Sequence, residues 1–340
     1  MSDTVGNDHP ALRSFWHPVA WSSEVLSPSG SEDAALVATQ LLGQPLVLLR
    51  STDGDVRVFY DECPHRGAPI SAGHCNNNKL VCGFHGWQFD INGQAVLVPS
   101  LGPNAPIPGR ARLGQPANIC EMYGLVWVAL DPPRLPIPKW LDGDDGKLGA
   151  FRPTAHTSRV LAVYQTDNLL DASHFGFLHS SLAQRNPLIE PYELIDQHDL
   201  GFCTALRKVA ADNQSTEGWL RYTLAAPFTV LLRSEEPDGA LRQSFFQAIQ
   251  PIDQHHTRLF FMVRVPETDP DILEAMLHDE ERVQQEDLQM TAAQRRTGMS
   301  VIGGPDLHVR SDRNGVLYRQ TLRHMVGLSE TAQPLAAPEQ

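Results

Sequence analysis

Two short segments of the chain place cysteine and histidine side chains at a spacing that suits metal binding. The first segment contains Cys63 and His65, and the second contains Cys82 and His85. Each segment offers one thiolate and one imidazole, and sixteen residues separate His65 from Cys82. Two such loops facing each other can hold two metal ions, because each loop can give its cysteine to one ion and its histidine to the other.

The ligand types narrow the chemistry of these two loops. Two cysteines and two histidines ligate a Rieske [2Fe–2S] cluster, in which imidazole replaces thiolate on one iron and raises the reduction potential. A structural zinc site is the alternative, because the same four side chains suit tetrahedral zinc. Zinc loops usually pair like with like, whereas each loop here mixes cysteine and histidine. The segment resembles the Rieske signature Cys-x-His…Cys-x-x-His, so we expect Cys63, His65, Cys82 and His85 to bind a [2Fe–2S] cluster.

A second group of candidate ligands follows about ninety residues later. We expect a helix from about residue 165 to residue 177, with His174 near its end and His179 beyond it. Residues five apart diverge by about 140° on a regular helix. The two imidazoles can therefore converge only if the helix ends between them, which Gly176 would permit.

Two histidines and one carboxylate on one face of an iron ion leave positions open for oxygen and substrate. Asp287 is the candidate carboxylate, in a long helix expected from near Pro270 to about Arg296, with Thr268 or Asp269 as its N-cap. Other acidic residues of the same helix are rivals for this role: Glu286, and less strongly Glu280 and Glu281.

The surrounding pattern predicts two domains that carry these ligands. Residues 35–135 contain many short strand-like apolar runs, with a hairpin signal at Asn92-Gly93, and predict an all-β domain over residues 15–135. A proline-rich linker at 131–138 ends it. Residues 136–330 combine antiparallel strands with the long helix, which predicts an α+β domain with a cavity between sheet and helix. The strands expected there are Leu220–Leu224, Thr229–Arg233, Ser244–Ile249 and Leu259–Val265.

Composition excludes several classes of protein. The chain has 340 residues and a net charge of −13, and no basic stretch predicts nucleic-acid binding. The first residues lack the pattern of a signal peptide, and no run of about 18 apolar residues predicts a membrane span. We therefore expect a cytoplasmic location. The cysteines outside the cluster loops are expected to be reduced thiols: Cys75, Cys120 and Cys203.

The pattern Asn168…Asp171…His174…His179 after a Rieske segment resembles the terminal oxygenase component of Rieske non-haem iron oxygenases. The resemblance covers nearly the whole chain, although Gly83 and Phe84 stand where the family often has proline and tyrosine. It implies a helix-grip (START-like) catalytic domain and mononuclear Fe(II) held by His174, His179 and Asp287. It also implies that Asp171 bridges to a cluster histidine of a neighbouring subunit in a homotrimer, and that Asn168 lines the site.

The length of the chain resembles that of single-subunit O- and N-demethylases, above all methylxanthine-type N-demethylases, rather than longer ring-dihydroxylating subunits. We therefore expect an O2-dependent monooxygenase that demethylates or hydroxylates a small aromatic or heterocyclic compound. The alternatives are a ring hydroxylase or dioxygenase without demethylation and, more remotely, a non-catalytic Rieske electron carrier. The pocket is expected near Leu231, Phe246 and Leu288.

Electrons must reach this protein from outside, because the chain has neither a Gly-x-Gly-x-x-Gly motif nor a plant-type ferredoxin cysteine set. We expect a separate reductase that oxidises NAD(P)H, with or without a ferredoxin. A local basic patch would help an acidic donor to dock on this acidic protein, and four residues of the Rieske segment are candidates for it: Arg66, Lys79, Arg110 and Arg112.

Overall fold

The computed structural model describes residues 3–26, 35–102, 105–139, 150–179, 192–198, 200–205, 207–209, 218–235, 240–265 and 269–327. The chain forms two compact units. One consists of Arg13–Pro136, and the other of Met1–Leu12 together with Ile137–Gln340. The first twelve residues thus belong to the second unit, where β1 (Thr4–Val5) pairs with β20 (Met299–Ser300). No helix among the described residues is long and apolar enough to cross a bilayer.

The unit Arg13–Pro136 is built from three small antiparallel sheets, in the orders β10-β11-β2, β3-β4-β5 and β6-β7-β8-β9. The hairpin predicted at Asn92-Gly93 is confirmed, a second hairpin turns at Gly54, and both glycines have positive φ, as these turns require. The strands are β2 (His17–Trp21), β3 (Val37–Leu41), β4 (Gln44–Arg50), β5 (Val56–Tyr60), β6 (His74–Asn76), β7 (Lys79–Val81), β8 (Gln88–Phe89), β9 (Ala95–Leu97), β10 (Asn118–Met122) and β11 (Leu125–Ala129).

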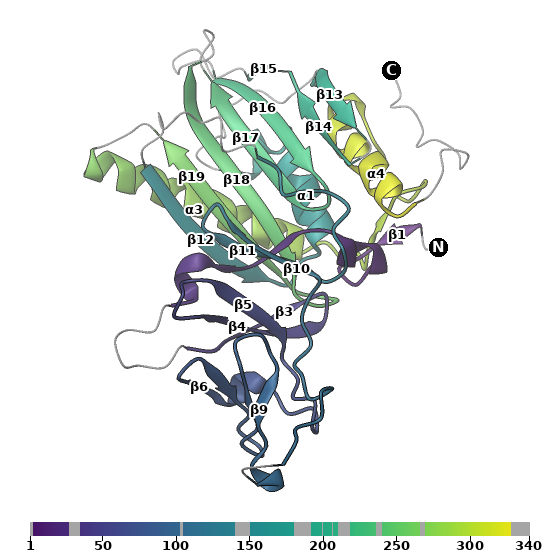
Figure 1. The fold of residues 1–340 in the computed structure, drawn as a ribbon. Helices are drawn as coiled ribbons and strands as arrows, with labels where there is room; N and C mark the ends of the chain where they lie inside the picture. The colour runs from purple at the N-terminus through teal and green to yellow at the C-terminus, as the bar shows by residue number, and fades with distance from the viewer. Residues whose placement is uncertain are drawn as a thin grey trace. The chain divides into compact units, whose positions relative to one another are not determined.

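The other unit is an α+β domain around one large antiparallel sheet (Figure 1). The strand order is β12-β19-β18-β17-β16-β14-β13, and β15 pairs with β16 outside this path. All four predicted strands are present as β16 to β19. The strands are β12 (Ala150–Ser158), β13 (Leu194–His198), β14 (Gly201–Thr204), β15 (Arg207–Val209), β16 (Gly218–Ala225), β17 (Thr229–Glu235), β18 (Leu241–Pro251) and β19 (Thr257–Val265).

Helix α3 (Pro270–Ala292), which carries the candidate ligand Asp287, packs with other helices beside this sheet. It begins where the sequence predicted, because the carboxylate of Asp269 accepts hydrogen bonds from the backbone N–H groups of Asp271 and Ile272. Thr268, the alternative cap, lies outside the described residues. Helix α1 (Ala162–Leu170) packs against α3 and against β17 and β18. Helix α4 (Arg313–Met325) packs against α1 and β14.

The prediction of one helix from residue 165 to residue 177 is wrong. Helix α1 ends at Leu170, because Asp171 leaves the helical conformation and its Oδ1 accepts a hydrogen bond from the Ser173 N–H at 2.7 Å. A separate single turn, α2 (Phe175–Leu178), follows. Gly176 lies inside that turn, and the chain leaves the helical conformation at His179 itself, whose backbone is extended, rather than at the glycine.

Candidate functional site

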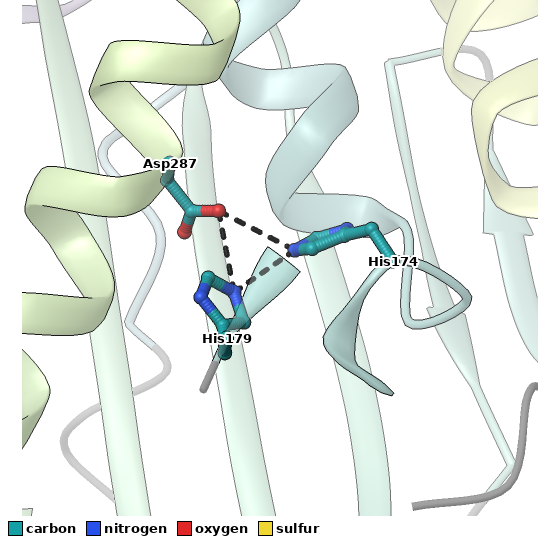
Figure 2. Close-up of side chains that lie close together, drawn as sticks. All are labelled: His174, His179 and Asp287. Atoms are coloured by element: carbon teal, nitrogen blue, oxygen red, sulfur yellow. Dashed lines mark hydrogen bonds and ion pairs between the residues drawn. The ribbon is translucent and has the colours of Figure 1, made fainter. Parts of the chain in front are cut away.

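Three potential ligand atoms meet between α2 and α3 (Figure 2). Nε2 of His174 lies 3.2 Å from Nε2 of His179, and Oδ1 of Asp287 lies 3.4 Å and 3.3 Å from these two nitrogens. His174 and His179 stand at the two ends of the single turn α2, as its N-cap and C-cap. The site is buried, since the side chains of His179 and Asp287 are 1% and 5% exposed.

The outer nitrogens of both imidazoles are held by further carboxylates. Nδ1 of His174 lies 3.2 Å from Oδ2 of Asp171, and Nδ1 of His179 lies 2.9 Å from Oε2 of Glu286. A carboxylate accepts the proton of Nδ1, which leaves Nε2 of each ring as a lone-pair donor. Two lone pairs and the carboxylate of Asp287 then face one another, and this arrangement is stable only if a cation lies between them.

The spacing of the three atoms suits a transition-metal ion. A point equidistant from atoms separated by 3.2–3.4 Å lies about 1.9 Å from each in their plane, and about 2.0–2.2 Å when it is slightly out of plane. Oδ1 of Asp287 is buried and has no hydrogen-bond partner among the described residues. The side chains therefore fit the two-histidine, one-carboxylate set that holds non-haem Fe(II).

The pKa values of the metal-free site also show that this site favours a bound positive charge. Burial lowers the pKa of His174, but Asp171 and Asp287 more than offset burial and raise it to about 9. Burial opposes ionisation of Asp287, yet its contacts with His174 and His179, helped by Asn168, lower its pKa to about 2. Without a metal, the site therefore binds a proton at neutral pH.

The structure distinguishes among the acidic residues that the sequence left open. Asp287 faces the two Nε2 atoms, whereas Glu286 contacts the far side of His179. Glu280 accepts a hydrogen bond from Gln243 at 3.3 Å, and neither it nor Glu281 belongs to the group of potential ligands. The contact between Glu286 and His179 was not predicted, because its partner lies 107 residues away in the sequence.

The two cysteine–histidine loops have the same backbone turn. The N–H of Gly67 donates to the carbonyl of Cys63 at 2.9 Å, and the N–H of Gly86 donates to the carbonyl of Cys82 at 3.0 Å. Both glycines adopt positive φ, at 71° and 67°. The two cysteines therefore begin equivalent turns, each closed by a glycine four residues later, although His65 and His85 follow their cysteines by two and by three residues.

Thiols and imidazoles of these loops occupy different environments. Cys63 and Cys82 are 2% exposed, whereas His65 and His85 are exposed with ring centroids 4.5 Å apart. Burial, with the nearby Cys82 thiol, raises the pKa of Cys63 to about 11, so the metal-free loop keeps a protonated thiol there. Buried thiols beside exposed imidazoles fit a Rieske cluster, with one iron held by sulfur inside and the other by nitrogen at the surface.

The three residues expected near the substrate pocket do not lie on one side of the sheet. Gln247 of β18 donates a hydrogen bond to Gln284 of α3, so its neighbour Phe246 points to the opposite face of the sheet. Leu231 pairs with Phe246 and shares that face. Of the three residues expected near the pocket, Leu288 is buried on α3, and the two strand residues face away from this helix.

The basic residues expected to form a docking patch are all exposed on the unit Arg13–Pro136: Arg66, Lys79, Arg110 and Arg112.

Comparisons with known proteins identify a family for each of the two domains. Residues 15–113 match the Rieske [2Fe–2S] domain, and residues 162–327 match the vanillate O-demethylase oxygenase C-terminal domain. The chain is 30% identical to methylxanthine N1-demethylase NdmA of Pseudomonas putida over 282 residues, which cover 81% of this chain and 79% of that protein. It is 28% identical to the 3-chlorobenzoate-3,4-dioxygenase oxygenase subunit of Comamonas testosteroni, over 74% of this chain and 58% of that protein.

Solved structures show the same architecture. NdmA of Pseudomonas putida with caffeine superimposes with a TM-score of 0.77 at 27% identity, covering 93% of this chain and 92% of that one. Dicamba monooxygenase shares the fold, with a TM-score of 0.74 at 19% identity, covering 92% and 97% of the two chains. The paired loops, the iron-binding geometry and these relatives lead to one conclusion: the chain belongs to the Rieske non-haem iron oxygenases, and is an oxidoreductase of the terminal oxygenase type with an iron–sulfur cluster and a non-haem iron.

Proposed function

We propose that this protein is a monooxygenase that removes a methyl group from nitrogen or oxygen of a small aromatic or heterocyclic compound. The observation that carries the proposal is the group of His174, His179 and Asp287, whose ligand atoms lie 3.2–3.4 Å apart in a buried site. A non-catalytic electron carrier would have no use for this group. The similarity to methylxanthine N1- and N3-demethylases of Pseudomonas putida favours demethylation.

The residues have separate roles in this reaction. Cys63, His65, Cys82 and His85 would hold the cluster, and His174, His179 and Asp287 the Fe(II) ion. When bound, the cluster supplies single electrons and the iron supplies the chemistry by which O2 oxidises a C–H bond. Asp171 and Glu286 orient the two imidazoles. The protein would thus contribute positioning and a buried site that keeps bulk water from the reaction.

The reaction balances with two electrons from an external donor. One oxygen atom of O2 enters a methyl C–H bond to give a hydroxymethyl group, and the other leaves as water after uptake of two electrons and two protons. The hydroxymethyl group on nitrogen or oxygen then releases formaldehyde and leaves N–H or O–H. We expect the electrons to come from NAD(P)H through a separate reductase, with or without a ferredoxin.

We further propose that the protein works as a homotrimer in which the cluster of one subunit lies next to Asp171 of its neighbour. Asp171 is 36% exposed while it contacts His174, so a second molecule can reach it. His65 and His85 are exposed at the cluster loops, and so are the nearby Phe84 and, beside the iron site, Phe177. A fully active monomer in light-scattering and activity measurements would contradict this assembly.

The direct test of the reaction is formaldehyde release. The reduced protein, a surrogate reductase and O2 are offered a panel of N-methyl and O-methyl aromatic and heterocyclic compounds, and the products are analysed by mass spectrometry. Formaldehyde formed in step with a product lighter by one methylene supports demethylation. Oxygenated products without formaldehyde would replace it by ring hydroxylation or dioxygenation, for which the 3-chlorobenzoate-3,4-dioxygenase relative is the precedent.

A further inference from the structure

The large sheet has one face toward α3, and side-chain contacts identify which residues it carries. On β18, Gln243 contacts Glu280 and Gln247 contacts Gln284, and Phe245 between them packs in the apolar cluster that includes residues of α3. The odd-numbered residues of β18 therefore point toward the helix. The pairing register carries this assignment to the neighbouring strands β16, β17 and β19.

Positive charge is segregated to the opposite face of these strands. Four arginines of β16, β17 and β19 pair, directly or through a neighbouring strand, with even-numbered residues of β18. Their side chains therefore point away from α3: Arg221, Arg233, Arg258 and Arg264. Arg242 stands at the register shift at the start of β18. In the described parts of β16 to β19, no regularly paired position on the α3 side is lysine or arginine.

Helices α1, α2 and α3 are equally poor in positive charge, and on α4, which packs against α1, the buried Arg319 is paired with Asp167 and Asp306. Helices α1 and α2 contain no lysine or arginine. The single arginine of α3, Arg282, is paired with Asp279. Three carboxylates surround the two ligand histidines: Asp171, Glu286 and Asp287. Against the two positive charges of Fe(II), they leave one net negative charge, so an anionic substrate would meet repulsion without a cationic partner.

Tyr222 offers an unused hydrogen-bonding group on the α3 side of the sheet. It pairs with Leu232, which pairs with Phe245, so its ring lies on the face toward α3. The residue is fully buried, and among the described residues its hydroxyl makes no hydrogen bond of ordinary geometry, Tyr192 being the side chain that interacts with it. The ring of Tyr192 contacts it edge-on, with centroids 5.2 Å apart. A buried hydroxyl without a partner is unfavourable unless a ligand or water completes it.

The hydroxyl of Tyr222 lies in the electric field of the iron-site carboxylates. Burial, assisted by Tyr192, Asp171 and Asp287, raises the pKa of Tyr222 well above its ordinary value. The phenol therefore keeps its proton over the working pH range and can donate a hydrogen bond.

We propose that the substrate of this oxygenase is uncharged at neutral pH and accepts a hydrogen bond from Oη of Tyr222 through a carbonyl, an ether oxygen or a ring nitrogen. This inference rests on the proposed function for the identity of the site, and it adds the charge class of the substrate. It predicts that aromatic carboxylates, which need a cationic partner, are poor ligands.

The first experiment measures binding to the anaerobic, iron-loaded protein by isothermal titration. The probes are uncharged methyl compounds and carboxylates of similar shape: 4-methoxybenzamide against 4-methoxybenzoate, and 1-methyluracil against its 6-carboxylate. We expect the uncharged member to bind at least about tenfold more tightly in a pair that binds. A carboxylate that binds as tightly as its partner, or the absence of binding by both uncharged probes, would overturn the proposal.

The second experiment compares two tyrosine variants. Tyr222→Phe removes only the hydroxyl, and we expect about tenfold weaker binding of the uncharged probe with an unchanged melting temperature. Tyr318→Phe is the matched control, because Tyr318 is equally buried but its hydroxyl donates to the carbonyl of Pro227 at 3.1 Å. That variant should lose stability and keep its affinity. A Tyr222→Phe variant that melts lower and binds normally would assign the hydroxyl to the fold instead.

Failure of this inference and failure of the proposed function give different results. An uncharged methyl probe that binds through Tyr222 but is never demethylated would contradict the proposed demethylation and leave the charge class intact. A carboxylate that is bound and demethylated would contradict the inferred charge class and leave the proposed demethylation intact.

Discussion

Oε2 of Glu286 lies 2.9 Å from Nδ1 of His179, on the side of the ring away from the other ligand atoms. The adjacent residue, Asp287, faces Nε2 of the same ring at 3.3 Å. Two consecutive acidic residues of α3 thus serve one histidine in different ways, one as an expected ligand and one as the group that orients the ring. The helix makes this division because consecutive side chains point about 100° apart.

The role of Glu286 in orienting His179 can be tested without changing any of the proposed iron ligands. Glu286→Gln keeps an acceptor oxygen but removes the charge, and Glu286→Leu removes both. We expect iron retention to weaken by about tenfold in the first variant and by up to about 100-fold in the second, measured by competition with a chelator. Glu281→Gln on the same helix is the control, since Glu281 lies outside the ligand group. Equal iron retention in all of these variants would remove Glu286 from the site.

Asp171 is expected to matter for electron transfer more than for metal binding. Its Oδ1 accepts from the Ser173 N–H and its Oδ2 contacts Nδ1 of His174. Asp171→Asn keeps an oxygen for the Ser173 turn, so both metal sites should remain filled. Reoxidation of the reduced cluster in the presence of substrate and O2 should slow by about 100-fold, measured by stopped-flow absorbance. Unchanged turnover in this variant would exclude the bridging role.

The pH dependence of metal loading follows from the pKa of His174, which the surrounding carboxylates raise to about 9 despite burial. A pKa raised above its unfolded value means that proton binding stabilises the metal-free fold below about pH 6.5, and that this contribution is lost as the pH rises through about 9. The metal must displace that proton. Metal affinity should therefore rise by roughly tenfold per pH unit from pH 7 and level off near pH 9.

Anaerobic titration with Co(II), followed by its visible absorption, measures this profile. A flat profile between pH 7 and pH 9 would show that no proton is displaced from the site.

The cluster loops make a separate prediction. Cys82→Ser should remove the visible chromophore, because serine replaces a thiolate that the cluster needs. Cys120→Ser is the matched control, since Cys120 lies on β10 outside the two loops. Absorption spectra of the purified variants decide the matter, and a Cys82→Ser protein with the full chromophore would contradict the assignment of this ligand.

Sequence reasoning located the strands and α3 because their signals are local. Apolar runs predict the four strands β16 to β19, and an aspartate before a proline predicts the start of α3. The break after α1 was misplaced because an aspartate can end a helix through its own side chain, as Asp171 does, and this competes with the more familiar signal of Gly176.

The sequence could predict the site only for ligands that lie close together along the chain. His174 and His179 are close in sequence, but the choice between Asp287 and Glu286 depends on how α3 is rotated about its axis. Tyr222 gave no signal at all, because its importance comes from burial without a partner. The expected pocket residues Leu231 and Phe246 failed because a strand buried on both faces shows no alternation to say which face meets the helix.

The iron content of the purified, reconstituted protein tests the central claim most directly. An oxygenase with a [2Fe–2S] cluster and a mononuclear site should contain about three irons per chain. His174→Ala should contain about two and keep the chromophore, while His278→Ala, an exposed histidine on the same helix as Asp287, should keep about three. About two irons in the unaltered protein, or no loss in His174→Ala, would contradict the account of this site.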